Sequence, residues 1–456
     1  MLETKIQWRL KLLLLAMIVA VLTYLGRHTE MDDALIYARY IRNALDGNGL
    51  VFNPGEHVNA LTSPLFSYLL LGGSWLLKGH ILLTTTLLSG IFLFLAVTLA
   101  ERLVPFAGFL VASTSYFYIL VGMESALFLF MLILIVTLYI ERKDAWIPIV
   151  SILLILTRYE GAAMVFVIAI GLYKAKRIPR WTSYLPVVAV MILYCWLNYH
   201  WYGSVIPSSA TSKIGQGMSG MWGPWPKAFL EWGRTLIPVF MPMIYIVPLV
   251  AFGAIYAVLR DQHREMNLLI TSFCGIALAF YILFNIPGYR WYYAPFIFFG
   301  MFCACQSIPN AKGFRRGALA IIVLLLISSF YSLKRASTDL SGNYYHLAEW
   351  LNQNTLPESR IEASETGTIG WYSPNRYIID ILGLTTPKNA VHIAHRDVSS
   401  WLGEDHPDYI IVHDIVHDTD WPWEKVARQS PDYVPVGGHF GNAYVLERKS
   451  LVKQSE

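Results

Sequence analysis

The 456-residue chain contains 55% hydrophobic and 14% charged residues and has a net charge of +4. Soluble domains carry about a quarter charged residues, so this composition excludes a soluble globular protein and is typical of a polytopic membrane protein. The small positive charge, without a basic low-complexity tail, gives no reason to expect nucleic-acid binding. The four cysteines all lie in apolar runs, so we expect neither a disulfide framework nor a zinc site.

The N-terminal segment combines a basic start with an apolar run, as signal peptides and first membrane helices both do. Lys5, Arg9 and Lys11 begin the segment, and the apolar run covers residues 9–25. Residues 26–29 (Gly-Arg-His-Thr) do not form the small-residue cleavage site of a signal peptide. We therefore expect an uncleaved first helix.

Two adjacent carboxylates, Asp32 and Asp33, follow this helix at the start of a predicted outer loop, residues 27–79. Membrane proteins rarely keep charge at such positions without a function. The amphipathic run 35–45 includes Arg39 and predicts a helix in the membrane interface, with its arginine level with the lipid headgroups. Alternatively, the aspartates cap this helix, because Asp is favoured at helix N-termini.

The apolar stretch 64–77 decides the sidedness of everything that follows. It is short for a crossing and is split by Gly72-Gly73, so we expect it to dip into the outer leaflet or lie against it. The alternative is a short true span, which would place every later loop on the opposite side.

The remaining apolar segments complete a set of about eleven predicted transmembrane helices. Lysine and arginine concentrate in alternate connections, which the positive-inside rule places in the cytoplasm. The predicted spans are 9–25, 80–100, 104–121, 125–141, 145–157, 161–173, 182–200, 236–259, 267–285, 290–308 and 317–332.

Two of these segments, 145–157 and 161–173, are too short to cross a bilayer separately. Both are flanked by basic connections, so they should form a hairpin whose apex is drawn into the membrane from the outer side. The apex contains Arg158 and Glu160, which need partners or water at that depth and therefore predict a cavity. Alternatively, the two side chains simply pair with each other.

The composition changes after residue 333. Residues 334–456 are polar and contain alternating apolar runs, a helical stretch at 344–352 and a turn at Gly437-Gly438. We therefore divide the chain into a transmembrane domain, 1–333, and a small α/β domain, 334–456, which an odd number of crossings places outside. Its strands are expected at 360–365, 377–382, 408–413 and 442–447.

Polar side chains gather at the predicted outer ends of the spans. The acids are Asp32, Asp33 and Glu124; the cations are Arg39, Arg158, Lys213 and Arg290; the aromatic rings include Trp371 and Tyr372. A carboxylate can take the proton from an attacking sugar hydroxyl, and arginines can hold a phosphate bidentately while a lipid tail stays in the bilayer. No glycine-rich phosphate loop follows a predicted strand, so this chemistry indicates a lipid-linked sugar donor.

Several of these residues have simpler explanations. Glu124 precedes the helix expected from Ser125 and could cap it. Arg290 could extend toward the lipid headgroups. Trp371 and Tyr372 could belong to the core of the outer domain or contact the bilayer.

An ordered set of motifs covers most of the chain, at residues 32–40, 47–56, 62–65, 122–127, 157–161, 202–213, 289–295, 370–373 and 380–384. The set resembles GT-C glycosyltransferases, specifically terminal arabinofuranosyltransferases of bacterial cell-wall arabinan. The resemblance implies inverting transfer of a sugar, first of all D-arabinofuranose, from a polyprenyl-phosphate donor to an envelope glycan or an exported protein such as pilin. The reaction would take place at the outer face of a bacterial inner membrane.

The resemblance also implies roles for the polar residues. Asp32 would act as general base and Asp33 as its orienting partner; some members use a divalent cation such as Mg²⁺ or Mn²⁺, which these aspartates would contact, and others use none. Substrate contacts are expected from Glu124, Glu160, Trp371 and Tyr372. Donor-phosphate contacts are expected from Arg158, Arg290, Arg39 and Lys213.

A transporter or flippase of lipid-linked sugars is the alternative class. It would place acids and cations near the middle of long spans and would show an internal repeat. The sequence shows no such repeat, and its charges cluster at one face, which favours an enzyme.

Overall fold

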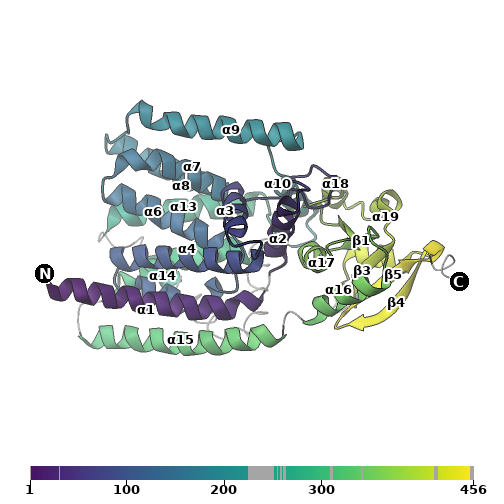
Figure 1. Cartoon of the computed structure of the whole chain (residues 1–456). Helices are drawn as coiled ribbons and strands as arrows, with labels where there is room; N and C mark the ends of the chain where they lie inside the picture. Colours follow the sequence, from purple (N-terminus) through teal and green to yellow (C-terminus); the bar gives the residue numbers. More distant parts are fainter. Residues whose placement is uncertain are drawn as a thin grey trace.

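The computed structural model describes residues 2–29, 31–223, 251–253, 255–256, 259, 263–308, 312–339, 342–414 and 420–451. It consists of a helical bundle with a smaller α/β domain at one end (Figure 1). The predicted span 236–259 lies largely outside the described residues. The bundle contains α1 (Leu2–Gly26), α2 (Asp32–Leu45), α3 (Pro64–Leu76), α4 (Ile81–Leu103), α5 (Ala107–Ala112), α6 (Ser125–Ile140), α7 (Ile147–Thr157), α8 (Gly161–Lys174), α9 (Leu185–Tyr202), α10 (Ser208–Ser219), α13 (Arg264–Leu283), α14 (Ala294–Cys305) and α15 (Lys312–Asp339). Short 3-10 turns are η1 (Arg27–Thr29), η2 (Ser115–Phe117), η3 (Asp144–Trp146), η4 (Trp181–Tyr184) and η5 (Arg290–Tyr293).

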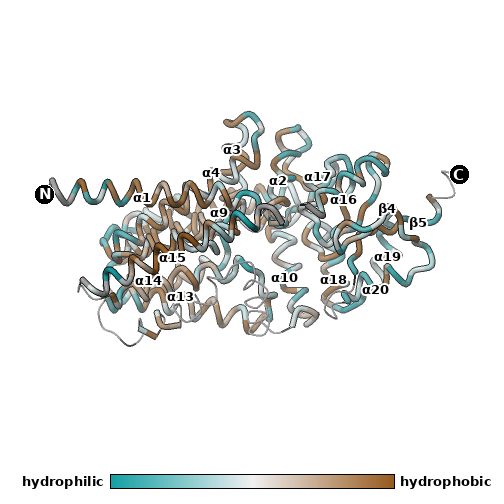
Figure 2. The backbone as a smooth tube through the Cα atoms, turned by 90° about the horizontal axis from the view of Figure 1, so that it is seen from below, coloured by the Kyte–Doolittle hydropathy of each residue, from teal (hydrophilic) through white to brown (hydrophobic). Residues whose placement is uncertain are grey.

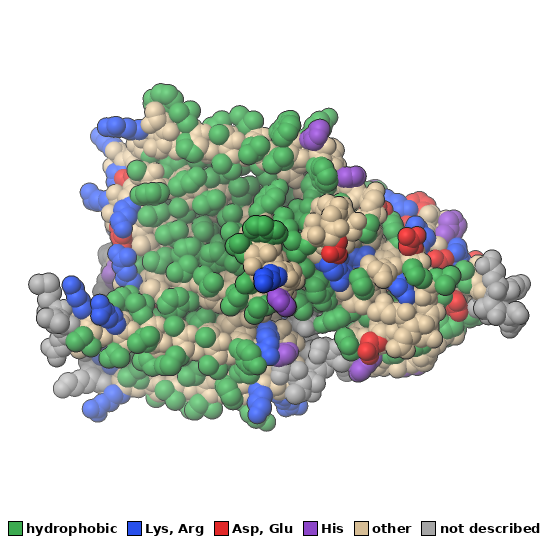
Figure 3. Space-filling view, viewed as in Figure 1, with side chains coloured by type: hydrophobic (Ala, Val, Ile, Leu, Met, Phe, Trp, Pro, Cys, Tyr) green, Lys and Arg blue, Asp and Glu red, His purple; other side chains and the backbone are tan. Residues whose placement is uncertain are grey.

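The bundle has the surface of a membrane-embedded protein. Within the described residues, five helical segments are long and apolar enough to cross a bilayer. Hydrophobic residues run along these helices, while the smaller domain is mostly hydrophilic (Figure 2). Green hydrophobic side chains cover the visible bundle face, with basic side chains gathered at the end opposite the α/β domain (Figure 3). The five segments are Lys5–Thr29, Ile81–Leu103, Trp181–Tyr202, Arg264–Leu283 and Arg315–Ala336.

Helices α1 and α4 run antiparallel, and this arrangement shows where the first loop begins and ends. Near one end, Lys11 of α1 forms an ion pair with Glu101 of α4 at 2.6 Å. Toward the other end, a Cβ at Gly90 would lie 3.4 Å from Thr23. The loop between these helices therefore begins and ends at the same end of the bundle. Helix α3 does not cross it, in agreement with the expectation for residues 64–77.

The predicted span 104–121 is not a continuous helix. Helix α5 stops at Ala112, and a short 3-10 turn follows. The hydroxyl of Ser329 on α15 fills the break: it donates to the carbonyl of Ser113 at 2.7 Å and accepts from the N–H of Ser115 at 2.8 Å. The interruption was not predictable because these bonds come from a segment distant in sequence.

The outer domain contains one five-stranded sheet in the order β2-β1-β3-β5-β4. The pairs β1–β2 and β1–β3 are parallel, whereas β3–β5 and β5–β4 are antiparallel. Its elements are α16 (Gly342–Asn354), β1 (Arg360–Ala363), α17 (Thr366–Tyr372), β2 (Tyr377–Asp380), α18 (Pro387–His395), α19 (Ser400–Asp405), β3 (Tyr409–His413), α20 (Pro422–Gln429), β4 (Tyr433–Phe440) and β5 (Ala443–Arg448).

All four expected strands of this domain are present, and the sheet also contains β4, which the sequence analysis did not predict. Helix α15 continues past the expected boundary at residue 333 and ends at Asp339. Gly437-Gly438 is not a turn between elements but lies inside β4, where the pairing with β5 is irregular between Val436 and His439. Both glycines have positive φ, as a bulge in a strand often requires.

Helix α17 joins the outer domain to α2 at the end of the bundle. Gly367 and Gly370 face α2: a Cβ at Gly367 would overlap the carbonyl oxygen of Asp32, and one at Gly370 would lie 2.9 Å from Phe52. The two helices can approach this closely only because both positions lack a side chain.

Arg39 of α2 completes this junction, and the sequence analysis was wrong about its surroundings. Its side chain is fully buried within the protein and therefore does not contact lipid headgroups. The guanidinium donates to the carbonyls of Phe52 at 2.8 Å, Gly370 at 2.6 Å and Arg376 at 2.7 Å, and also to the side-chain oxygen of Asn53 at 3.2 Å. Its donors are therefore already used within the protein, so Arg39 holds the domain to the bundle rather than a phosphate.

A methyl group at Gly367 should undo this docking. We expect Gly367→Ala to lower the free energy of unfolding by about 1–3 kcal/mol, because the added Cβ must displace the start of α2. Thermal unfolding of the purified protein in detergent measures the effect. Gly403→Ala is the matched control, since Gly403 lies in a helix of the same domain and has open space around it. Equal melting temperatures for both variants would contradict this description of the junction.

Candidate functional site

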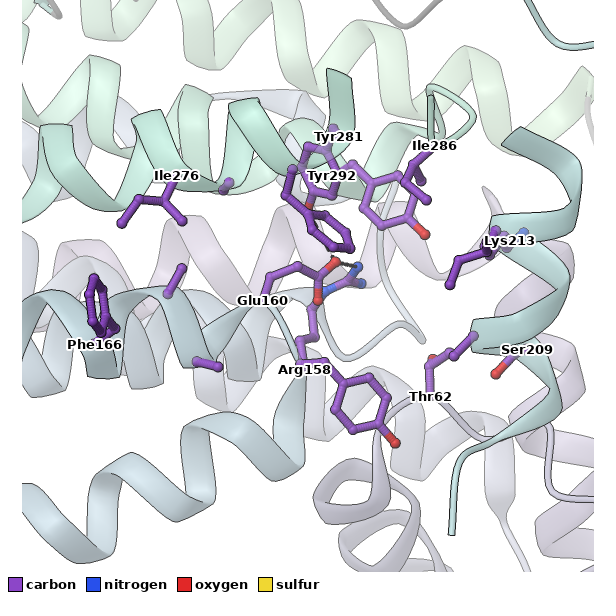
Figure 4. A pocket seen from close by; sticks show the side chains of 17 residues that line it. Thr62, Arg158, Glu160, Phe166, Ser209, Lys213, Ile276, Tyr281, Ile286 and Tyr292 are labelled. Carbon is purple, nitrogen blue, oxygen red and sulfur yellow. Dashed lines mark hydrogen bonds and ion pairs between the residues drawn. The ribbon is translucent and has the colours of Figure 1, made fainter. Parts of the chain in front are cut away.

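A cavity of about 440 Å³ opens between the apex of the α7–α8 hairpin, α10 and α13. Phe166 of α8 and Ile276 of α13 lie at one end of it, and Lys213 and Ser209 of α10 lie at the other (Figure 4). Phe166 is 59% exposed and so faces the surroundings of the bundle. The cavity is therefore apolar where it opens among the helices and polar beneath the outer domain.

The hairpin apex lies at the middle of this cavity, as the sequence analysis predicted. Arg158 is buried and forms two ion pairs, one with Glu124 and one with Glu160 at 2.7 Å. Glu160 also accepts a hydrogen bond from the hydroxyl of Tyr281 at 3.1 Å. The simple Arg158–Glu160 pair considered from the sequence is thus part of a larger group that includes Glu124. The guanidinium lies 5.1 Å from the ring centroid of Tyr292, within cation–π range.

A second, smaller chamber of about 30 Å³ adjoins the cavity on the side of the outer domain. Arg158, Ser209 and Lys213 line both spaces, so the two are neighbours across these side chains. Asp33 and Glu124 line the chamber. Glu124 is 1% exposed, and its second carboxylate oxygen has no hydrogen-bond partner among the described residues. A buried acceptor without a partner is costly, so this oxygen is suited to bind a ligand hydroxyl.

The capping role considered for Glu124 is not observed. The residue occupies the N-cap position of α6 but forms no side-chain capping bond. Its carboxylate pairs with Arg158 instead.

Asp32 and Asp33 are adjacent in sequence but have different surroundings. Asp32 accepts hydrogen bonds from the N–H groups of Gly367 at 3.1 Å and Thr368 at 2.7 Å, at the start of α17. Asp33 lines the inner chamber, and no described residue donates a hydrogen bond to its carboxylate. Neither residue caps α2, because the N-cap position is Met31 and lacks a side-chain capping bond. The carboxylate that faces the chamber is therefore that of Asp33.

The environment of Asp32 also affects its protonation. Burial, followed by the neighbouring charge of Asp33, raises the pKa of Asp32 to about 7. Its hydrogen bonds with Thr368 lower the pKa and offset only part of this change.

Lys213 supplies a second cation to both spaces. Its ammonium lies 3.7 Å from the ring centroid of Tyr289 and 5.5 Å from that of Trp291. Among the described residues, no carboxylate forms an ion pair with it. Arg158, in contrast, is paired with two carboxylates. Lys213 is thus the cation of this site whose charge is not already balanced by an ion pair.

Three other predicted residues do not line either space. Arg290 is half-buried beside Tyr116, whose hydroxyl donates to the carbonyl of Arg290. The guanidinium of Arg42 lies 4.5 Å from the ring centroid of Trp371. Tyr372 lies against Tyr345, with 5.2 Å between the ring centroids. The structure therefore places Trp371 at the junction of α2 and α17 and Tyr372 beside α16, away from the chamber.

The residues present do not fit a divalent cation held by Asp32 and Asp33. Asp32 already accepts hydrogen bonds from α17. In the part of the chain that the structure describes, no three His, Cys, Asp or Glu side chains are grouped as a metal site.

ArnT from Cupriavidus metallidurans bound to undecaprenyl phosphate superposes with a TM-score of 0.57 at 11% sequence identity, covering 96% of this chain and 98% of ArnT. The apo form of that protein gives a TM-score of 0.54 at 11% identity, covering 97% and 98%. The chain has the GT-C fold. At this identity the likeness concerns the fold alone, and it confirms the predicted fold class.

Matches found by sequence cover only parts of this chain. The family model described as "Domain of unknown function (DUF8728)" matches residues 335–450, which contain the outer domain. A terminal beta-(1->2)-arabinofuranosyltransferase of Mycobacterium tuberculosis is 57% identical over 44 residues. This match covers 10% of the chain and 7% of that protein, so the chain resembles only a small part of it.

Sequence reasoning missed three residues of the candidate site. Ser209 and Thr62 line both spaces, and Tyr281 donates to Glu160. Serine and threonine are common in helices and turns, and nothing local distinguishes these two. One available signal was the spacing of Ser209 and Lys213, which places them on the same face of a helix.

Proposed function

We propose that the protein transfers a sugar from a polyprenyl-phosphate donor to an acceptor hydroxyl at the outer end of the bundle. The observation that carries this proposal is that an apolar cavity and a polar, charged chamber are neighbours and share the side chains of Arg158, Ser209 and Lys213. A lipid tail can occupy the space between α8 and α13, a phosphate can lie near Lys213, and the sugar can reach Asp33. The fold supports the proposal, because ArnT, which shares it, has been seen bound to undecaprenyl phosphate.

In the proposed reaction, Asp33 rather than Asp32 acts as general base. The acceptor oxygen attacks the anomeric carbon, the bond from that carbon to the phosphate oxygen breaks, and polyprenyl phosphate leaves with the bonding electrons. The proton of the acceptor hydroxyl passes to the Asp33 carboxylate. Attack opposite the leaving group inverts the anomeric centre. Asp33 suits this role because its carboxylate faces the chamber, whereas the carboxylate of Asp32 accepts hydrogen bonds from the start of α17.

The other residues position the donor in this proposal. Lys213 balances the phosphate charge as the bond breaks. Arg158 fixes Glu124 and Glu160 and keeps a positive charge beside the phosphate. The unpartnered oxygen of Glu124 accepts a hydrogen bond from a sugar hydroxyl.

Removing the Lys213 charge should weaken donor binding. We expect Lys213→Met to bind a short polyprenyl phosphate about 10- to 100-fold more weakly, since a charge-assisted hydrogen bond is lost. Equilibrium binding in detergent measures this change. Lys174→Met is the control, because Lys174 is exposed at the opposite end of α8. Unchanged affinity in Lys213→Met would assign the phosphate to another cation.

D-arabinofuranose is the first choice of sugar, and an envelope glycan or an exported protein such as pilin is the proposed acceptor. The short stretch shared with an arabinofuranosyltransferase supports the choice of sugar. We further propose that the protein resides in the bacterial inner membrane with the outer domain in the periplasm or exterior. The basic connections at the opposite end of the bundle support this orientation. Mass spectrometry of envelope glycans and pilins, with and without the protein, identifies the sugar and acceptor.

A reconstituted reaction tests transfer against the alternative of a flippase. Purified protein in liposomes is given a polyprenyl-phosphate sugar, and acceptor is then added. Release of polyprenyl phosphate that depends on the acceptor supports transfer. Movement of intact donor between leaflets without cleavage supports a flippase and contradicts the proposed function.

A further inference from the structure

Helix α10 carries four serines, and one of them differs from the rest. The hydroxyl of Ser208 donates to Asn59 at 3.0 Å, that of Ser212 to Leu382 at 2.5 Å and that of Ser219 to Gln216 at 2.6 Å; all three acceptors are backbone carbonyls.

The hydroxyl of Ser209 has no hydrogen-bond partner among the described residues, although the residue is only 1% exposed. Its position on the helix explains why. Several buried hydroxyls elsewhere in the bundle donate to the carbonyl four residues earlier, as in Ser67 at 2.8 Å, Thr137 at 2.6 Å and Ser151 at 2.8 Å, although others, such as that of Ser74, have no partner among the described residues. Ser209 lies in the first turn of α10, so the residue four positions earlier is outside the helix. A buried hydroxyl without a partner is unfavourable, and a bound ligand can supply the missing acceptor.

The surroundings of Ser209 indicate the charge of that ligand. Ser209 lines both the cavity and the inner chamber, as does Lys213. The two residues are four positions apart and therefore lie on the same face of α10. In addition, the N-terminal end of this twelve-residue helix carries partial positive charge. Hydroxyl, ammonium and helix terminus together favour an anion.

We propose that the Ser209 hydroxyl donates a hydrogen bond to a non-bridging phosphate oxygen of the lipid-linked donor, beside Lys213. This inference rests on the proposed function for the class of donor. Ser209 holds the phosphate on the side of α10, while Arg158 lies at the middle of the cavity (Figure 4). The arrangement leaves Asp33 and the free oxygen of Glu124 for the sugar and the acceptor.

Binding of a short-chain polyprenyl phosphate, compared with the matching polyprenol, tests this inference in the full-length protein. We expect Ser209→Ala to bind the phosphate about tenfold more weakly and the polyprenol unchanged. Ser209→Thr should keep the preference for phosphate because it keeps the hydroxyl. Ser209→Cys should behave like Ser209→Ala, since a thiol is a weak donor of similar shape.

Ser212→Ala is the matched control on the same helix. Ser212→Ala removes the hydrogen bond from the Ser212 hydroxyl to the carbonyl of Leu382 in the outer domain. This variant should therefore have lower thermal stability but an unchanged preference for phosphate. If wild type binds both lipids equally, the donor class in the proposed function is wrong. If wild type prefers the phosphate and Ser209→Ala and Ser209→Cys retain the full preference, the inference on Ser209 is wrong and the proposed function stands.

Discussion

Asp33→Asn is expected to lower turnover by roughly 10²–10⁴-fold while leaving donor affinity close to that of wild type. The substitution keeps the shape of the side chain but removes the group that takes the proton. Because no described residue donates a hydrogen bond to Asp33, its replacement breaks no bond within the protein and should leave the melting temperature unchanged. Steady-state rates with a polyprenyl-phosphate sugar, together with thermal unfolding, measure both effects.

Asp32→Asn is the natural comparison, since the same substitution is made one residue earlier. Asp32 bonds to the start of α17, so its replacement should lower the melting temperature and affect turnover indirectly. Rescue of activity at lower temperature is then expected for Asp32→Asn but not for Asp33→Asn. Normal turnover in Asp33→Asn with complete loss in stable Asp32→Asn would return the base to Asp32, as the sequence analysis first assigned it.

Arg158→Met is expected to cause the largest loss of stability, about 3–5 kcal/mol. The substitution leaves Glu124 and Glu160 buried without their shared cation. Thermal unfolding in detergent should show a large decrease in melting temperature. Adding Glu124→Gln and Glu160→Gln to Arg158→Met should restore part of the loss, because neutral amides are less costly to bury than unpaired carboxylates.

One further variant separates charge from geometry at this position, and a surface ion pair provides the control. Arg158→Lys keeps the charge but loses the planar fork that contacts both glutamates, so it should remain clearly less stable than wild type. Arg102→Ala is the exposed control: its ion pair with Glu141 lies at the surface, and its loss should cost no more than about 1 kcal/mol. Comparable melting temperatures for Arg158→Met and Arg102→Ala would show that the buried ion pairs contribute little.

Much of the architecture could be predicted from the sequence because it depends on local composition. Hydropathy marked the helices, and the charge of the connections separated the two ends of the bundle. The short segments around Arg158 predicted a hairpin apex beside a cavity, and alternation of apolar residues located four strands of the outer domain. The break between α5 and η2 was not predicted, because the bonds that fill it come from Ser329 on α15.

The sequence by itself determined the membrane character of this protein and the kinds of charged residue gathered at one end. Tertiary structure alone decided what each of those residues does. Arg39 contacts backbone carbonyls more than 300 positions away, and Asp32 contacts a helix 335 positions away. Such partners leave no periodic or compositional trace near the residue itself. For this reason, adjacent aspartates looked equivalent in sequence, whereas packing against α17 occupies Asp32 and leaves Asp33 facing the chamber.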